Sequence, residues 1–190
     1  MKHSRRAPIV LSIVSLVAMV CAAAETRLSS AGLGAAQFGM SLQQVEQALG
    51  STFQVTASQR AKWQSGECTT RSAGMPGTSL VFAKGRFSAA VLSKGSSAMT
   101  RSGLAIGNAE AKAIATLKGD PTYRRAESRY SDGKGNDMDI IVGKADFDKA
   151  RGAFKGNIVR IFSQKGRIVT ISAGQASYVM LDEHDDDSCP

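Results

Sequence analysis

Residues suited to histidine-based chemistry are scarce in this chain. Its 190 residues include two histidines, His3 and His184. His184 lies within an acidic run, 182–187, whose carboxylates and imidazole could together bind a divalent cation. Such a run is more typical of a solvated tail that complements a basic protein. A Ser-His-Asp triad would require this tail to fold back, so we expect no metal, no cofactor and no histidine-based catalysis.

The other acidic residues give weak signals for catalysis. A carboxylate pair for glycoside cleavage could come from Glu46, Glu67, Glu110 or Glu127. Glu46 and Glu110 fall on predicted helices, where an exposed acid is the default expectation. The loop 132–137 begins like a calcium site but carries Lys at the third position and no Gly at the sixth, so it predicts a hairpin turn. We therefore expect that the chain is not an enzyme.

The segment 123–130 is the strongest candidate for a binding surface. On a strand, Tyr123, Arg125 and Arg129 share one face, which we expect to point outward. Arginine and tyrosine dominate binding hot spots because they combine contact area with directed hydrogen bonds. Trp63, the single tryptophan, is a further candidate for partner binding, and burial in the core is an equally good interpretation of it.

The elements that must position these side chains are predicted to occur twice. The stretches 38–50 and 106–121 each open with an apolar residue and glycine, then continue as a short amphipathic helix. In the first, Ser41 and Gln44 have the spacing of a capping box. In the second, Asn108 is predicted to cap the helix.

Each predicted helix is followed by strands. The segments 80–92 and 161–171 both have the pattern strand, Lys-Gly-Arg turn, strand, and further strands are predicted around 61–71 and within 123–142. We expect an α+β fold: two tandem helix-plus-antiparallel-sheet repeats that form one domain, with the helices packed on one sheet face. The other face should stay open to solvent.

The first residues have the features of a secretory signal, namely a basic start, an apolar run over 7–20 and small residues at 22–24. The alternatives are a transmembrane anchor, for which the run falls short of the roughly 20 residues required, and a lipid anchor on Cys21, which follows an unsuitable Val20. We expect cleavage after Ala24 and a periplasmic or secreted protein. The predicted organisation is a signal peptide (1–24), an N-terminal segment (25–32), a first repeat with linker (33–103), a second repeat (104–181) and an acidic tail (182–190).

Cysteine content is consistent with this compartment. Of three cysteines, Cys21 would leave with the signal, so that Cys68 and Cys189 remain. An even pair in an oxidising compartment predicts one disulfide between them, and two free thiols are the alternative.

The charge distribution indicates an acidic partner. Residues 25–181 carry 21 basic and 11 acidic side chains, and the tail that follows is acidic. We expect the basic open face to bind an exported protein or an anionic envelope glycan, because complementary charge accelerates association. Nucleic acid would bind only nonspecifically.

The motif Phe-Gly-Met-Ser-Leu-Gln-Gln-Val-Glu-Gln-Ala-Leu-Gly over 38–50 resembles the repeat opening of the β-lactamase inhibitor protein family, and it is similar to the unit of small outer-membrane assembly lipoproteins. A closer resemblance is to exported bacterial proteins with two such units, in which a Gly-Glu-Cys segment (here 66–68) and a cysteine near the C-terminus (here Cys189) recur. This resemblance covers most of 33–189. It implies the two-unit fold and a noncatalytic binding or inhibitor-like role.

The resemblance leaves other roles open. A cell-envelope assembly or scaffold component is the main alternative, and an envelope hydrolase is a more distant one. Inhibition of β-lactamase is not expected to carry over, because the chain lacks a disulfide within each repeat and has few aromatic residues.

Overall fold

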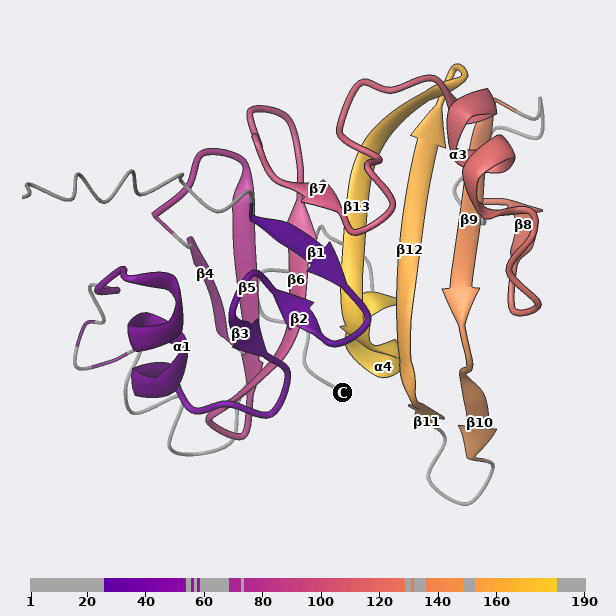
Figure 1. Ribbon diagram of the computed structural model, residues 1–190. Helices are drawn as coiled ribbons and strands as arrows, with labels where there is room; N and C mark the ends of the chain where they lie inside the picture. Colours follow the sequence, from indigo (N-terminus) through magenta and orange to yellow (C-terminus); the bar gives the residue numbers. More distant parts are fainter. Residues whose placement is uncertain are drawn as a thin grey trace, which may run out of the picture.

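The computed structural model describes residues 26–53, 56, 58, 69–72, 74–128, 131, 136–148 and 153–180. Its largest element is a seven-stranded antiparallel sheet in the order β4-β5-β6-β13-β12-β9-β8 (Figure 1). The strands are β4 (Thr69–Ser72), β5 (Thr78–Ala83), β6 (Arg86–Leu92), β8 (Arg124–Glu127), β9 (Asp137–Gly143), β12 (Asn157–Gln164) and β13 (Arg167–Gln175).

A smaller, four-stranded sheet has the order β3-β2-β1-β7. It consists of β1 (Arg27–Ser29), β2 (Gly32–Leu33), β3 (Ala36–Gln37) and β7 (Met99–Thr100). A hairpin of β10 (Asp146–Asp148) and β11 (Ala153–Lys155) stands apart from both sheets. The described helices are α1 (Leu42–Leu49), α3 (Glu110–Leu117) and α4 (Ala176–Val179).

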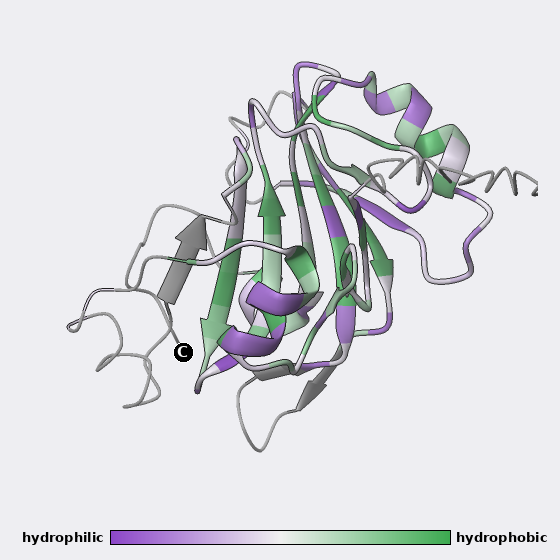
Figure 2. Ribbon diagram, turned by 60° about the vertical axis from the view of Figure 1, so that its left-hand side comes forward, coloured by the Kyte–Doolittle hydropathy of each residue, from purple (hydrophilic) through white to green (hydrophobic). Residues whose placement is uncertain are grey.

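The small sheet, α1 and α3 lie together on one face of the seven-stranded sheet (Figure 1). The main hydrophobic core fills the space between these two layers. Fully buried side chains come from every part of it, including Leu28 and Leu33 of the small sheet, Val45 of α1 and Ala113 of α3. Figure 2 shows hydrophobic residues along the long strands, and both hydrophobic and hydrophilic residues on the helices.

Several local predictions are confirmed. Helix α1 begins at a capping box in which Gln44 N–H donates to Ser41 Oγ and Ser41 N–H donates to Gln44 Oε1. The two Lys-Gly-Arg segments are the turns of the β5–β6 and β12–β13 hairpins. Lys84 and Lys165 each have a φ of 50°, a left-handed conformation that matches the twist of a tight hairpin.

The start of α3 differs from its prediction. Ala109 is the N-cap residue and makes no side-chain capping bond. Asn108 lies one residue earlier, where its Oδ1 accepts from Ala105 N–H and from the Lys112 ammonium. The prediction that Asn108 caps this helix is therefore wrong, because its side chain is held by the preceding turn instead.

The predicted α+β fold of two helix-plus-sheet repeats is also wrong. The described chain is mostly β, with two helices of eight residues and one of four. Much of the face that helices were expected to cover is covered by the four-stranded sheet. Its strands have two or three residues each, which is too short for a visible alternation of apolar and polar residues.

The opposite face of the large sheet, which was expected to be open, carries α4. Ala89, Gly174 and Ile158 lie side by side on this face, according to the strand register. Ala89 and Ile158 form a second apolar cluster with Ala176 and Val179 of α4. The small residues in this row let the short helix lie close to the sheet.

Candidate functional site

Tyr123 and Arg125, two residues of the predicted binding surface, differ in their exposure to solvent. Tyr123 is half-buried against the main core. Arg125 pairs with Ile140 in the strand register, and Ile140 belongs to that same core, so Arg125 lies on the sheet face that α3 covers. Arg125 is nevertheless exposed, whereas Tyr123 packs against the core rather than facing outward as predicted. Arg129, Trp63, Cys68 and Cys189 lie outside the described residues, as does the loop 132–135.

Arg125 is instead engaged by a carboxylate of α3. Its Nη2 lies 2.7 Å and its Nε 2.8 Å from Glu110 Oε1. Ser163 Oγ of β12 donates to Glu110 Oε2 at 2.9 Å. Glu110 is 8 % exposed, although an exposed helical acid was expected at this position. Both oxygens of the Glu110 carboxylate therefore accept hydrogen bonds from within the fold, and the carboxylate joins α3 to β8 and β12.

A second ion pair, in which both partners are buried, lies on the opposite sheet face. Arg160 Nε donates to Asp139 Oδ1 at 2.8 Å, and its Nη2 donates to Asp139 Oδ2 at 3.1 Å. Arg160 Nη1 also donates to the Val179 carbonyl at 3.5 Å, at the end of α4. These bonds satisfy both charges internally, so this pair serves to hold α4 on the sheet.

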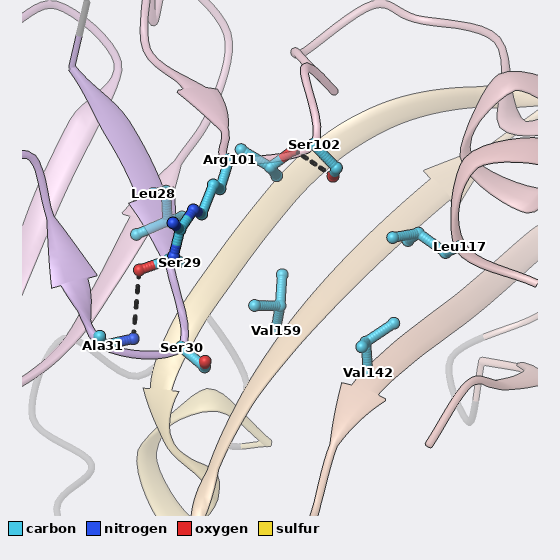
Figure 3. Close-up of a pocket in the computed structure, with 10 residues that line it drawn as sticks. Leu28, Ser29, Ser30, Ala31, Arg101, Ser102, Leu117, Val142 and Val159 are labelled. Atoms are coloured by element: carbon cyan, nitrogen blue, oxygen red, sulfur yellow. Dashed lines mark hydrogen bonds between the residues drawn. The ribbon is translucent and has the colours of Figure 1, made fainter. Parts of the chain in front are cut away.

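The structure shows a pocket of about 410 Å³ between the small sheet and α3 (Figure 3). This volume is within the range of small-molecule sites, roughly 300–1,000 Å³. Five separate parts of the chain form it: β1 with its following turn, the end of β7 with its following turn, the end of α3, and strands β9 and β12 of the large sheet. The lining residues are Leu28, Ser29, Ser30, Ala31, Thr100, Arg101, Ser102, Leu117, Val142 and Val159.

The floor of the pocket is apolar. Val159 of β12 and Val142 of β9 are direct neighbours in the strand register, and Leu117 from the last turn of α3 lies beside them (Figure 3). Leu117 and Val159 pack against the main core, and all three side chains are only half-buried. The small sheet contacts β6 and β13, and α3 contacts β9, which leaves this part of the core uncovered between them.

Hydrogen bonds fix the segments around the pocket. Asn157 Nδ2 at the start of β12 donates to the Ser30 carbonyl at 3.0 Å, which ties the β1–β2 turn to the large sheet. The Lys112 ammonium on α3 donates to the Gly103 carbonyl at 3.3 Å. The pocket is therefore preformed rather than left between unconnected elements.

The turn after β7 is equally well held. Thr100 N–H donates to the Leu104 carbonyl at 2.7 Å, and Leu104 N–H donates to Thr100 Oγ1 at 2.9 Å. Arg101 N–H donates to the Leu28 carbonyl of β1 at 2.9 Å. This turn places Arg101 and Ser102, both exposed, at the mouth of the pocket.

The side chains that line the pocket are suited to binding a ligand. Its described lining residues supply apolar surface, hydroxyl groups and one guanidinium, with no carboxylate, imidazole, amine or thiol among them. A hydroxyl without a neighbouring base is a poor nucleophile. Across the described part of the chain, no group of three or more His, Cys, Asp or Glu residues could hold a metal ion.

The comparisons with known proteins found no matching family model, no matching curated protein and no matching solved structure. None of the helices in the described ranges is long and apolar enough to cross a membrane.

Reasoning from the sequence missed the pocket. The sequence predicts only that Leu117 lies in the helical segment 106–121, Arg101 in the first repeat with its linker (33–103), and residues 29–31 in the N-terminal segment (25–32). The only available signal was the combination of serines and one arginine in two short segments, and nothing local indicates that these segments meet.

Proposed function

We propose that this chain is a noncatalytic binding protein that holds a small ligand with an apolar body in the pocket between β1, the turn after β7 and α3. The observation that carries this proposal is the half-buried apolar floor formed by Leu117, Val142 and Val159. Uncovered apolar surface continuous with a core gains free energy when a ligand removes it from water, about 25 cal/mol per Å².

The rigid surround of the pocket supports the same proposal. The bonds from Asn157 to Ser30 and from Lys112 to Gly103 hold the surrounding segments in place before any ligand arrives. A preformed site binds more tightly because less conformational entropy is lost on association. Removal of the segment 1–24 on export would place this binding protein in the periplasm or the medium.

The proposal can be tested by methyl NMR on the protein that begins at Glu25. A neutral apolar probe, decanol, should shift the methyl signals of Leu117, Val142 and Val159. The methyl signals of Val81 and Val91 should not move, because these side chains lie on the opposite face of the sheet, the one that carries Ala89. Equal shifts on both faces would indicate nonspecific adsorption and would contradict the proposal.

A pair of tryptophan variants provides a second test of the proposed ligand site. Ala31 is exposed at the mouth of the pocket, and Ala126 is exposed on β8. Ala31→Trp should block decanol binding, whereas Ala126→Trp should leave it unchanged. Intact mass of the exported protein tests the compartment separately, since its chain should begin at Glu25.

A further inference from the structure

The pocket combines its apolar floor with a single charged side chain. Arg101 is the one ionisable residue among the described residues that line it. Its side chain is exposed, and no carboxylate in the described part of the chain forms an ion pair with it. By contrast, Arg125 and Arg160 are both neutralised by partners within the fold.

Arg101 and the apolar floor lie on different sides of the same pocket. In Figure 3 the Arg101 side chain runs along the β1 wall, across from Leu117 and Val142, with Val159 between them. A ligand lying over Val159 would therefore have one end near the guanidinium and the other over Val142 and Leu117.

We infer that the ligand is an amphiphilic anion with one oxyanion head group and a hydrocarbon body, the head group bound by Arg101. This inference rests on the proposed function and specifies its ligand class. The planar guanidinium matches the oxygens of a carboxylate or a phosphate, which it binds with two parallel hydrogen bonds. The exposed hydroxyl of Ser30 at the mouth offers a further donor. The excess of basic residues in 25–181 favours the approach of an anion.

The test compares ligands that share a ten-carbon chain and differ in the head group. Decanoate, decyl phosphate, decanol and decylamine are titrated at neutral pH, below their micellar concentrations, and the methyl shifts of Val142 and Val159 report binding. Decanoate or decyl phosphate should bind about tenfold more tightly than decanol, the size expected for a hydrogen-bonded charge. Decylamine should bind most weakly. The order of the two anions shows which head group is preferred.

Variants separate the guanidinium from the general positive charge. Arg101→Gln should bring the affinity for decanoate down to that for decanol, and Arg101→Lys should keep part of the difference. Arg124→Gln is the matched control, because it removes one exposed arginine that lies outside the pocket. The two variants, Arg101→Gln and Arg124→Gln, therefore have the same net charge. Arg124→Gln should not change the affinity for decanoate.

The two proposals fail in different ways. If decanol and decanoate bind equally well in the wild type, and Arg101→Gln changes neither, the ligand class is wrong and the pocket remains a binding site. If none of the four compounds shifts the methyl signals of Val142 and Val159, the proposed function is wrong as well. If Arg124→Gln weakens decanoate as much as Arg101→Gln does, long-range charge explains the preference and the assignment to Arg101 is overturned.

Discussion

Glu110 and Arg125 form an ion pair, 2.7 Å between Oε1 and Nη2, that joins the first turn of α3 to β8. The arginine is 41 % exposed at its side chain and the carboxylate 10 %, so water reaches one partner far more than the other. Arg125 is one of the side chains that the sequence predicted to bind a partner. The effect of the ion pair is to hold α3 over β9, where Leu117 then forms part of the apolar floor of the pocket.

The first prediction concerns this ion pair. Glu110→Ala should lower the free energy of unfolding by about 1–3 kcal/mol, because it leaves the buried Ser163 hydroxyl with only the Met138 carbonyl, 3.4 Å away, as an acceptor and leaves Arg125 without its partner. Arg125→Ala should cost about 1 kcal/mol, since solvent screens this exposed partner. Denaturant unfolding measures both. Arg124→Ala, an exposed neighbour on the same strand, is the control, and a loss there equal to that of Arg125→Ala would show that the pair adds nothing.

The second prediction concerns the junction between β6 and β13. Gly174 has a φ of +139°, and an added Cβ would lie 2.2 Å from the Ser88 carbonyl oxygen and 2.5 Å from Ala89 Cα. Gly174→Ala should therefore cost roughly 3 kcal/mol or more, because the backbone strain and the clash add together.

A matched glycine separates these two contributions. Gly166 in the β12–β13 turn also has a positive φ, +75°, but no atom lies within 4 Å of its added Cβ. Gly166→Ala should cost only the strain, about 1–2 kcal/mol. Thermal or urea unfolding of the two variants distinguishes them, and equal losses would mean that the β6–β13 contact is looser than described.

The third prediction concerns pH. Hydrogen bonds from the Thr122 hydroxyl and, secondarily, from the Thr122 backbone N–H lower the pKa of Asp120 below its usual 3.8. A carboxyl whose pKa is lowered by folding stabilises the native state above pH 3.8, and this contribution is lost as the pH falls through the lowered pKa. The turn formed by Asp120 and Thr122 directly follows α3.

Thr122→Val should raise the pKa of Asp120 toward 3.8, as measured by NMR titration of its side-chain carboxyl carbon. Thr116→Val is the control, because the Thr116 hydroxyl donates to the Lys112 carbonyl and not to Asp120. An Asp120 pKa that stays low in the Thr122 variant would assign the shift to the backbone N–H alone. The variant also removes the acceptor for Gly143 N–H, so the end of β9 should exchange its amide protons faster.

Interactions between residues close in sequence could be predicted from the sequence alone. The capping box joins Ser41 to Gln44, three positions apart, and the hairpin turns at Lys84 and Lys165 depend on residues within a few positions. Such contacts depend on local backbone conformation, which the residue types themselves favour. The strands of the two hairpins were also predictable from the sequence, because each strand is long enough to show an apolar pattern.

Only the tertiary structure decided which side chains meet. Arg125 and Glu110 are 15 residues apart, and the orientation of β8 toward α3 determines that they form an ion pair rather than a binding surface. The pocket depends on longer separations still, since it brings Leu28 and Arg101 together with Val159. Strands of two or three residues have little stability of their own and form only when packed against the large sheet. The layer that covers the core, and the gap in that layer that forms the pocket, are therefore properties of the packed chain and not of any segment of the sequence.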